Sequence, residues 1–188
     1  MKRIVVGISG ASGGVMGVRL LAALRQAGVE THLVVTPGGW RSLARETSLT
    51  RGEIEAQASV CYAAEDLDAA IASGTFPADG MVVCPCSMGT VSAIANGTSD
   101  NLLERAADVV IKERGQLILV PRESPFSAIH LENMLKLARL GVTIMPAAPG
   151  FYHEPKSIED LVDFMVARIL DHLGVEHELT SRWGYANH

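Results

Sequence analysis

Residues 4–14 read Ile4-Val-Val-Gly-Ile-Ser-Gly-Ala-Ser-Gly-Gly14, and this stretch decides the fold class of the chain. Its first half is an apolar run typical of a short buried strand, and an amphipathic run that predicts a helix begins just after it. Strand, glycine turn and helix in this order open many nucleotide-binding α/β folds. The glycines let a ligand approach the backbone, and the helix start offers unpaired N–H groups to a phosphate. A tight turn without a ligand is the alternative.

The spacing of the glycines narrows the choice of nucleotide. Gly7, Gly10 and Gly13 follow the pattern G-x-x-G-x-x-G, which differs from the G-x-G-x-x-G fingerprint of dinucleotide sites. The second predicted strand, 31–36, ends in Thr-Pro-Gly-Gly and carries no acidic residue for a ribose. The chain also lacks the G-x-x-x-x-G-K-[ST] phosphate loop. NAD and ATP are therefore disfavoured, and a mononucleotide such as FMN remains open.

Length and composition predict one domain, 1–188, with a sizeable core. Of its 188 residues, 48% are hydrophobic and 20% are charged, as is usual for a globular protein. The net charge of -5 argues against nucleic acid as a main partner. No stretch approaches the length of a membrane span, and three cysteines do not suggest a disulfide framework. We expect a cytoplasmic protein.

Strands alternate with helices along the rest of the chain. We expect further strands at 81–84, 116–120 and 142–145, and helices at 40–46, from 90, 102–114, 127–140 and 157–173. Residues 50–78 read as irregular, with helical pieces near 53–58 and 65–72. This alternation predicts an α/β three-layer sandwich around a mainly parallel sheet. Ligands of such sheets bind beyond the carboxyl ends of the strands.

The segments that follow the predicted strands carry polar residues or glycines, although ordinary turn chemistry explains any one of them. Ser87 and Thr90 stand at a helix start, where hydroxyl and N–H groups can hold an anionic or polar ligand edge. Cys84 and Cys86 lack the second pair or histidines of a metal site, so we expect buried small residues.

Two pairs of charged residues are candidates for phosphate binding. Arg105 and Lys112 lie seven positions apart on one predicted helix, so they share nearly one face, about 10 Å apart along the axis. The alternative is a local ion pair between Asp108 and Lys112. Arg122 can bind a phosphate and the adjacent Glu123 can act as a general base, or the two can form a surface pair.

One acidic pair resembles half of a magnesium site. Asp160 and Asp163 form a D-x-x-D pattern at the start of a predicted helix. No partner motif accompanies them, and the helix dipole favours acidic residues in a first turn. We read them as a solvated first turn, and we expect no metal site.

The segment Pro121-Arg-Glu-Ser-Pro-Phe-Ser-Ala-Ile-His-Leu-Glu-Asn-Met134 is similar to the UbiX-type flavin prenyltransferases. The resemblance extends to four further segments and the tail: Ser9–Gly13, Cys84–Ser87, Asn101–Asp108, Met145–His153 and Arg182-Trp-Gly184. It covers nearly the whole chain except residues 50–78.

The resemblance implies an activity. Such enzymes transfer a dimethylallyl group from dimethylallyl phosphate to N5 and C6 of reduced FMN, without a metal. The prenylated FMN then serves a UbiD-type decarboxylase. The resemblance also implies a flavodoxin-like fold and a homododecamer with sites at subunit junctions, in which the C-terminal helix and tail, 157–188, make subunit contacts and close the site.

The resemblance also assigns roles by position. Residues expected to hold FMN are Gly10, Ala11, Ser12, Thr36, Ser87, Met88, Gly89, Thr90 and Arg122. Residues expected to hold the dimethylallyl phosphate are Arg105, Lys112, Tyr152 and Arg168. Ser12, Glu46 and Glu123 are expected to assist proton transfer, Lys112 to stabilise the leaving phosphate, and Trp183 to flank the allyl group. Thr36 replaces an expected serine but keeps the hydroxyl, and at Met88 a backbone contact tolerates the departure.

Two other functions stay in view. One is a flavin-dependent decarboxylase of cysteine-like thiols, disfavoured because those relatives carry a Pro-x-Met-Asn segment where this chain has Pro121-Arg-Glu-Ser-Pro125. The other is a non-catalytic FMN-binding subunit of a decarboxylase. For the prenyltransferase, we expect the cations to gather with the hydroxyl groups at the carboxyl edge of the sheet once copies of the chain have assembled.

Overall fold

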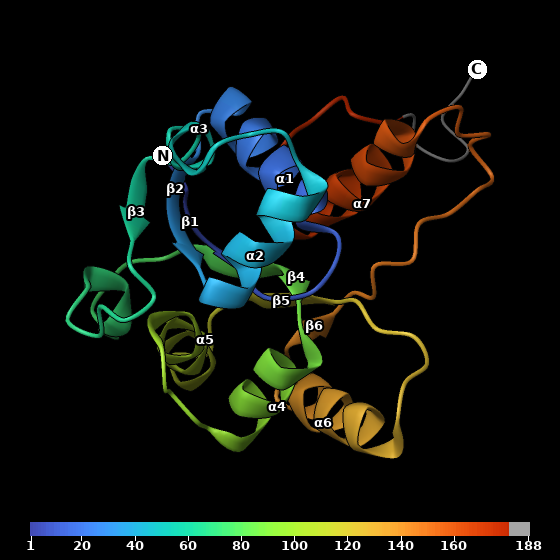
Figure 1. The fold of residues 1–188 in the computed structure, drawn as a ribbon. Coiled ribbons are helices and arrows are strands. Elements are labelled where there is room, and N and C mark those ends of the chain that lie inside the picture. The colour runs from blue at the N-terminus through green and yellow to red at the C-terminus, as the bar shows by residue number, and fades with distance from the viewer. Residues whose placement is uncertain (181–188) are drawn as a thin grey trace.

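A single parallel sheet forms the middle layer of the computed structural model, which describes residues 1–180 (Figure 1). Its strand order is β3-β2-β1-β4-β5-β6, and every neighbouring pair is parallel. The strands are β1 (Arg3–Ile8), β2 (Glu30–Val35), β3 (Val60–Tyr62), β4 (Gly80–Cys86), β5 (Leu117–Pro121) and β6 (Thr143–Ile144). Without the short edge strand β3, the order is that of a flavodoxin-like fold, as expected.

Helices cover both faces of the sheet and complete the three layers. One face carries α1 (Gly14–Gln26), α2 (Pro37–Glu46), α3 (Arg51–Glu55) and α7 (Ile158–Leu173). The other carries α4 (Met88–Asn96), α5 (Leu102–Lys112), α6 (Ala128–Arg139) and the short 3-10 helix η1 (Ala70–Ala72). The two groups of helices lie on either side of the strands in Figure 1.

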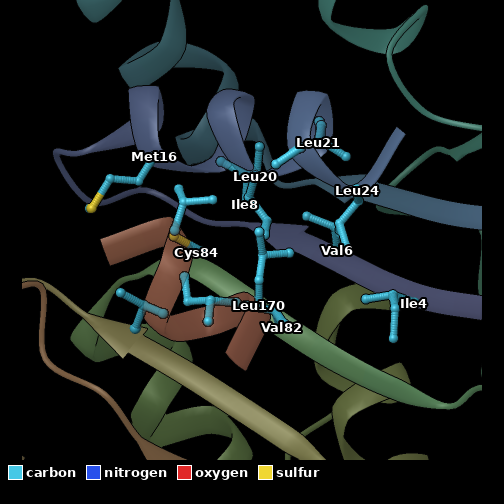
Figure 2. Packing of buried hydrophobic residues seen from close by; sticks show 14 of the residues in the cluster. Ile4, Val6, Ile8, Met16, Leu20, Leu21, Leu24, Val82, Cys84 and Leu170 are labelled. Carbon is cyan, nitrogen blue, oxygen red and sulfur yellow. The ribbon is translucent and has the colours of Figure 1, made fainter. Parts of the chain in front are cut away.

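The alternation of side chains along the strands explains why both faces are covered. Ile4, Val6 and Ile8 of β1 pack toward α1 and α7, whereas Val5 packs toward the α5 side. Figure 2 shows the first cluster, in which leucines of α1 and Leu170 of α7 meet β1 and β4. A strand buried on both faces reads as a continuous apolar run, and this made β1 recognisable in the sequence.

The predicted elements are confirmed, except that the helical piece expected near 65–72 is limited to the 3-10 helix η1, because residues 65–69 form turns. Three further local differences concern α2, β4 and β3. α2 begins at Pro37 rather than residue 40, because the Thr36 side chain caps it and proline suits a first helical position. β4 continues through Pro85 to Cys86, past an irregularity in its register with β5. The edge strand β3 lies in the segment that was read as irregular; pairing with β2, rather than a local apolar pattern, makes it a strand.

The first residues of the chain contact the C-terminal end of α7 at the amino edge of the sheet. Lys2 Nζ donates hydrogen bonds of 2.7 Å to the carbonyl oxygens of Leu173 and Gly174, which end α7. A cation near the C-terminus of a helix also interacts favourably with the helix dipole. Within residues 1–180, no helix is both long and apolar enough for a membrane span.

Candidate functional site

Three helix starts meet at the carboxyl ends of β1, β2 and β4. The α2 start is capped by Thr36, whose Oγ1 accepts a hydrogen bond of 3.1 Å from Gly39 N. The α4 start is capped by Ser87, whose Oγ accepts from Thr90 N at 3.2 Å. Strand order reverses at β1, between β2 and β4, and open α/β sheets bind ligands at such a switch point.

The start of α1 differs from our expectation, because a carboxylate already occupies its N–H groups. Glu46 Oε2 accepts hydrogen bonds from Gly13 N at 2.9 Å and from Gly14 N at 2.8 Å. Glu46 is the last residue of α2, so this contact also ties α2 to the glycine turn. A carboxylate suits the positive end of a helix. These two N–H groups are therefore not available to a phosphate, and the starts of α2 and α4 remain.

The glycine turn lies backbone to backbone against the start of α2. A Cβ on Gly10 would stand 3.1 Å from the Cα of Gly38, too close for a side chain without a backbone shift. Ala11 is buried in the turn, while Ser12 is exposed. A narrow turn of small residues, beside capped helix starts and hydroxyl groups, fits a flat polar ligand such as a flavin that carries a phosphate.

Ser9 is a site residue that our sequence reasoning assigned no role. It is 1% exposed, and its Oγ accepts a hydrogen bond of 2.8 Å from Ser87 N. The same hydroxyl lies 3.4 Å from the carbonyl oxygen of Pro85, to which it donates. Ser9 thus fixes the β1 turn against the β4 turn. The signal was present, since a serine directly after a buried strand has a hydroxyl that needs a partner.

Arg122 and Glu123 follow β5 and are both exposed at the carboxyl edge. Glu123 Oε1 accepts a hydrogen bond of 3.0 Å from Ser124 N, and Arg122 N donates to Cys86 O at 3.4 Å. The two side chains form no ion pair with each other in the part of the chain that the structure describes, so the surface-pair alternative is wrong.

The cations of α5 have local partners. Arg105 Nη1 forms an ion pair of 2.8 Å with Asp108 Oδ2, and its Nε donates to Ala72 O at 3.2 Å. Lys112 Nζ pairs with the neighbouring carboxylate of Glu113. The alternative pair of Asp108 with Lys112 is therefore wrong, because Asp108 faces Arg105 instead. All these groups are at least one-third exposed, where ion pairs contribute little stability.

Within one chain, the four cations do not gather at the carboxyl edge, so the expected site needs residues from neighbouring copies of the chain. Arg105 and Lys112 lie on α5, whereas Arg168 lies on α7, and these helices cover opposite faces of the sheet (Figure 1). Lys112 ends α5 shortly before β5 begins, so it lies toward the amino edge. Arg168 is exposed and its Nη1 is 3.1 Å from Asp171 Oδ2. Of the four, Arg122 alone directly follows a strand.

Tyr152 and Trp183 complete the expected site. Tyr152 lies in the connection between β6 and α7 and is 55% exposed. This connection starts from the carboxyl end of β6, so Tyr152 is on the side of the sheet where a ligand is expected. Trp183 lies outside the described residues.

The residues weighed as metal ligands have structural roles. Burial raises the pKa of the Cys84 thiol to about 12 and raises that of Cys86 as well. Asp160 Oδ2 accepts from the backbone N–H of Lys156, and Asp163 forms a bidentate pair with Arg19 of α1. Among the described residues, no three His, Cys, Asp or Glu side chains are grouped to hold a metal ion.

Known proteins resemble this chain in both sequence and structure. The Flavoprotein family matches residues 1–170. The flavin prenyltransferase LpdB of Lactiplantibacillus plantarum is 51% identical over 97% of this chain and 98% of its own length. The flavin prenyltransferase UbiX of Halalkalibacterium halodurans is 49% identical over 95% of this chain and 92% of its own length.

A solved structure agrees across the whole fold. The crystal structure of AnUbiX in complex with FMN and dimethylallyl pyrophosphate superposes with a TM-score of 0.97, at 44% identity, and 99% of each chain is covered. Both the sequence and the fold thus match over nearly the full length. The chain belongs to the Flavoprotein family and, within it, to the UbiX-type flavin prenyltransferases.

Proposed function

We propose that this enzyme binds reduced FMN at the β1–β4 switch point and transfers a dimethylallyl group from dimethylallyl phosphate to N5 and C6 of the flavin. The observation that carries the proposal is the meeting of two hydroxyl-capped helix starts and a glycine-rich turn of small residues at this point. FMN, when bound, supplies the two nucleophilic atoms. The residues of the chain bind both molecules, orient them and move protons.

The proposed FMN-binding site uses backbone groups more than side chains. Gly10, Ala11 and Ser12 lie along one side, Thr36 at the α2 start, and the segment Ser87–Thr90 at the α4 start. Met88 is buried, so it offers backbone N–H rather than its side chain. Arg122 is exposed beside the β4 turn and can add a charge-assisted hydrogen bond to an anionic group.

The proposed phosphate site is shared between copies of the chain. Arg105, Lys112 and Arg168 lie on opposite faces of one molecule, so a single copy cannot close them around one phosphate. A relative supports assembly: an FMN-dependent UbiX-like decarboxylase from Escherichia coli O157:H7, 47% identical with a TM-score of 0.94 over 96% of this chain and 98% of its own, is described as dodecameric. We propose that this chain also forms a homododecamer, in which α7 and the tail, 157–188, contribute to the junctions.

Charge development in the reaction explains the residue types. Breaking the allylic C–O bond leaves an allyl cation and a phosphate whose negative charge increases. Arg105, Lys112, Arg168 and the Tyr152 hydroxyl stabilise the departing phosphate. Trp183 is proposed to present an aromatic face to the cation, an interaction worth about 1–2 kcal/mol in a dry site.

Proton transfer is assigned to Ser12, Glu46 and Glu123. Bond formation at C6 requires a proton to add to the double bond of the transferred group and the C6 proton to be removed. Glu123 is an exposed carboxylate two residues after β5 and can serve these transfers. Glu46 Oε2 accepts hydrogen bonds from Gly13 N and Gly14 N, the two residues that follow Ser12 in the sequence. These bonds fix the position of its carboxyl group at the glycine turn. The product is proposed to pass to a UbiD-type decarboxylase. We place the reaction in the cytoplasm, where the three free thiols stay reduced.

Anaerobic incubation with reduced FMN and dimethylallyl monophosphate tests the reaction. We expect a flavin product heavier by one C5 unit in mass spectrometry, and a parallel incubation with the pyrophosphate compares the two donors. Tight FMN binding without this product contradicts the proposal and favours a non-catalytic subunit. Decarboxylation of a cysteine-like thiol instead favours the other alternative.

Lys112→Ala tests the shared phosphate site. We expect the KM for dimethylallyl phosphate to rise by about tenfold or more, because a charge-assisted contact is worth about 1.5–3 kcal/mol. FMN binding, measured by fluorescence quenching, is expected to stay unchanged. Lys136→Ala, which removes an exposed lysine from α6, is the matched control. Unchanged turnover in Lys112→Ala would mean that this lysine has only its surface pair with Glu113.

A further inference from the structure

The turn that carries Tyr152 is built around packed rings. Glu154 N donates a hydrogen bond of 3.1 Å to Phe151 O, so Tyr152 and His153 occupy the two central positions of a β-turn. Glu154 closes the turn with φ of 52°, a left-handed conformation that a non-glycine residue rarely adopts. The chain holds this turn in one shape, at a cost that other contacts must offset.

Two rings from the chain fix the orientation of the Tyr152 ring. Phe164 on α7 and Tyr152 meet edge to face, with ring centroids 5.8 Å apart at 80°. His153 meets Tyr152 in the same way, at 5.8 Å and 78°. His153 in turn stacks flat on Phe164, with centroids 5.1 Å apart and planes at 7°. Each of the three rings thus contacts the other two, and these contacts anchor the turn to α7.

The absence of a side chain at Gly150 leaves space for the Tyr152 ring. A Cβ on Gly150 would stand 2.9 Å from Cε1 of Tyr152 and 3.1 Å from Cζ of Phe164. Any side chain at this position therefore forces the Tyr152 ring, the Phe164 ring or both to move from this arrangement. Because Tyr152 is more than half exposed, its ring can swing outward without unfolding the core. The change would alter the direction of the tyrosine and leave the sheet intact.

His153 contributes its ring face rather than its nitrogens. Both Nδ1 and Nε2 are buried, and neither has a hydrogen-bond partner in the described part of the chain. Such an arrangement costs free energy, and a phenyl ring at the same place would avoid that cost. His153 therefore contributes to the fold through the stacking of its ring on Phe164.

We propose that Gly150, His153 and Phe164 are positioning residues, which hold the Tyr152 ring in the direction needed to contact the phosphate of the prenyl donor. The inference rests on the proposed function, in which Tyr152 binds that phosphate. None of the three positioning residues needs to touch the donor. Their common effect is to fix one tyrosine before the donor binds, so that less conformational entropy is lost in the complex.

The test measures donor binding apart from turnover. Enzyme loaded with oxidised FMN is titrated calorimetrically with dimethylallyl monophosphate, and KM and kcat are then measured with reduced FMN. Tyr152→Phe removes the hydroxyl group, and its loss of donor affinity is the reference for the other variants. We expect Gly150→Ala to raise the dissociation constant by about tenfold, up to the loss in Tyr152→Phe, with FMN affinity and melting temperature nearly unchanged. Gly52→Ala, where a Cβ meets nothing within 4 Å, is the matched control.

Two variants of His153 separate the ring face from the nitrogens. His153→Ala should weaken donor binding as Gly150→Ala does, whereas His153→Phe should bind within about twofold of the wild type. Equal losses in His153→Phe and His153→Ala would overturn the inference, because the nitrogens would then matter. Phe164→Leu gives an independent reading from α7 if His153→Ala does not fold.

The outcomes also distinguish this inference from the proposed function. If Tyr152→Phe weakens donor binding but Gly150→Ala does not, the positioning role is wrong and the proposed function stands. If Tyr152→Phe binds the donor like the wild type, the role of Tyr152 is wrong and the positioning role fails with it. If the wild type binds the donor but makes no prenylated product, the proposed function fails while the binding data still decide the positioning role.

Discussion

Cys84 and Cys86 flank Pro85 at the end of β4, and burial decides their chemistry. Neither thiol is exposed to solvent, and transfer out of water raises the pKa of Cys84 to about 12. The thiolate is the form that reacts and binds metals, so both residues behave as small core hydrophobes. Cys61 on β3 is exposed, although partial burial and the nearby Glu55 also raise its pKa.

Thiol titration of the native enzyme therefore has a defined expected result. With an aromatic disulfide reagent at pH 8, we expect one thiol, Cys61, to react in the folded protein and all three to react after denaturation. The Cys61→Ser variant should show no reactive thiol in the native state. Two or more reactive thiols in the native protein would contradict the buried position of β4.

The same burial predicts how stability depends on alkaline pH. The folded pKa of Cys84 is raised above the ordinary value of 9.0, so above that pH the unfolded thiol ionises while the folded one stays protonated. The free energy of unfolding should therefore fall as the pH rises past about 9. The difference between Cys84→Ala and the wild type in this pH dependence measures the contribution of Cys84 to the free energy of unfolding.

At the scale of elements, the helix ends decide where the site residues stand. The start of α7 has a full capping box: Ser157 Oγ accepts from Asp160 N at 3.2 Å, and Asp160 Oδ2 accepts from Ser157 N at 3.1 Å. Lys156 N donates to the same carboxylate oxygen at 2.7 Å. Asp160 of the D-x-x-D pattern thus caps the helix that carries Phe164 and Arg168. Asp163 pairs with Arg19 of α1, so it is not the solvated residue that we expected.

Asp160→Asn should make α7 less stable and remove an acid-sensitive contribution. The backbone N–H groups of Lys156 and Ser157 lower the pKa of Asp160 below its ordinary 3.8, so its stabilising effect is complete above that pH and is lost as the pH falls through the folded value. Thermal melts from pH 7 to pH 3 measure the effect. Glu159→Gln in the same turn is the control, and an equal effect there would exclude a specific cap.

The whole molecule leaves an apolar stripe on α6 exposed. Leu131 and Leu135 lie one turn apart on the same face of α6 and are 53% and 50% exposed. α6 follows the loop of Arg122 and Glu123, so a copy of the chain docked on this stripe would stand beside the candidate site. The proposed phosphate site, whose cations are divided between α5 and α7, would need such a neighbour.

Leu131→Glu combined with Leu135→Glu should break the assembly. Each leucine buried at an interface contributes about 1.5–3 kcal/mol, and a buried unpaired carboxylate reverses that gain. We expect a smaller species by size-exclusion chromatography with light scattering, together with loss of donor binding. Lys136→Glu reverses a charge on the same helix and leaves both leucines in place, so it should leave the mass unchanged. A double variant of wild-type mass would exclude the stripe from the assembly.

The sequence by itself determined the strand–turn–helix opening, the alternation of elements and the family, because these depend on local periodicity, glycine spacing and contiguous motifs. It did not determine that Glu46 occupies the start of α1 or that Ser9 joins two turns, since those contacts link residues 32 or more positions apart. Nor did it divide the cations between two faces. Residue spacing along one helix fixes which side chains share a face, but only the packing of helices on a sheet decides which faces meet.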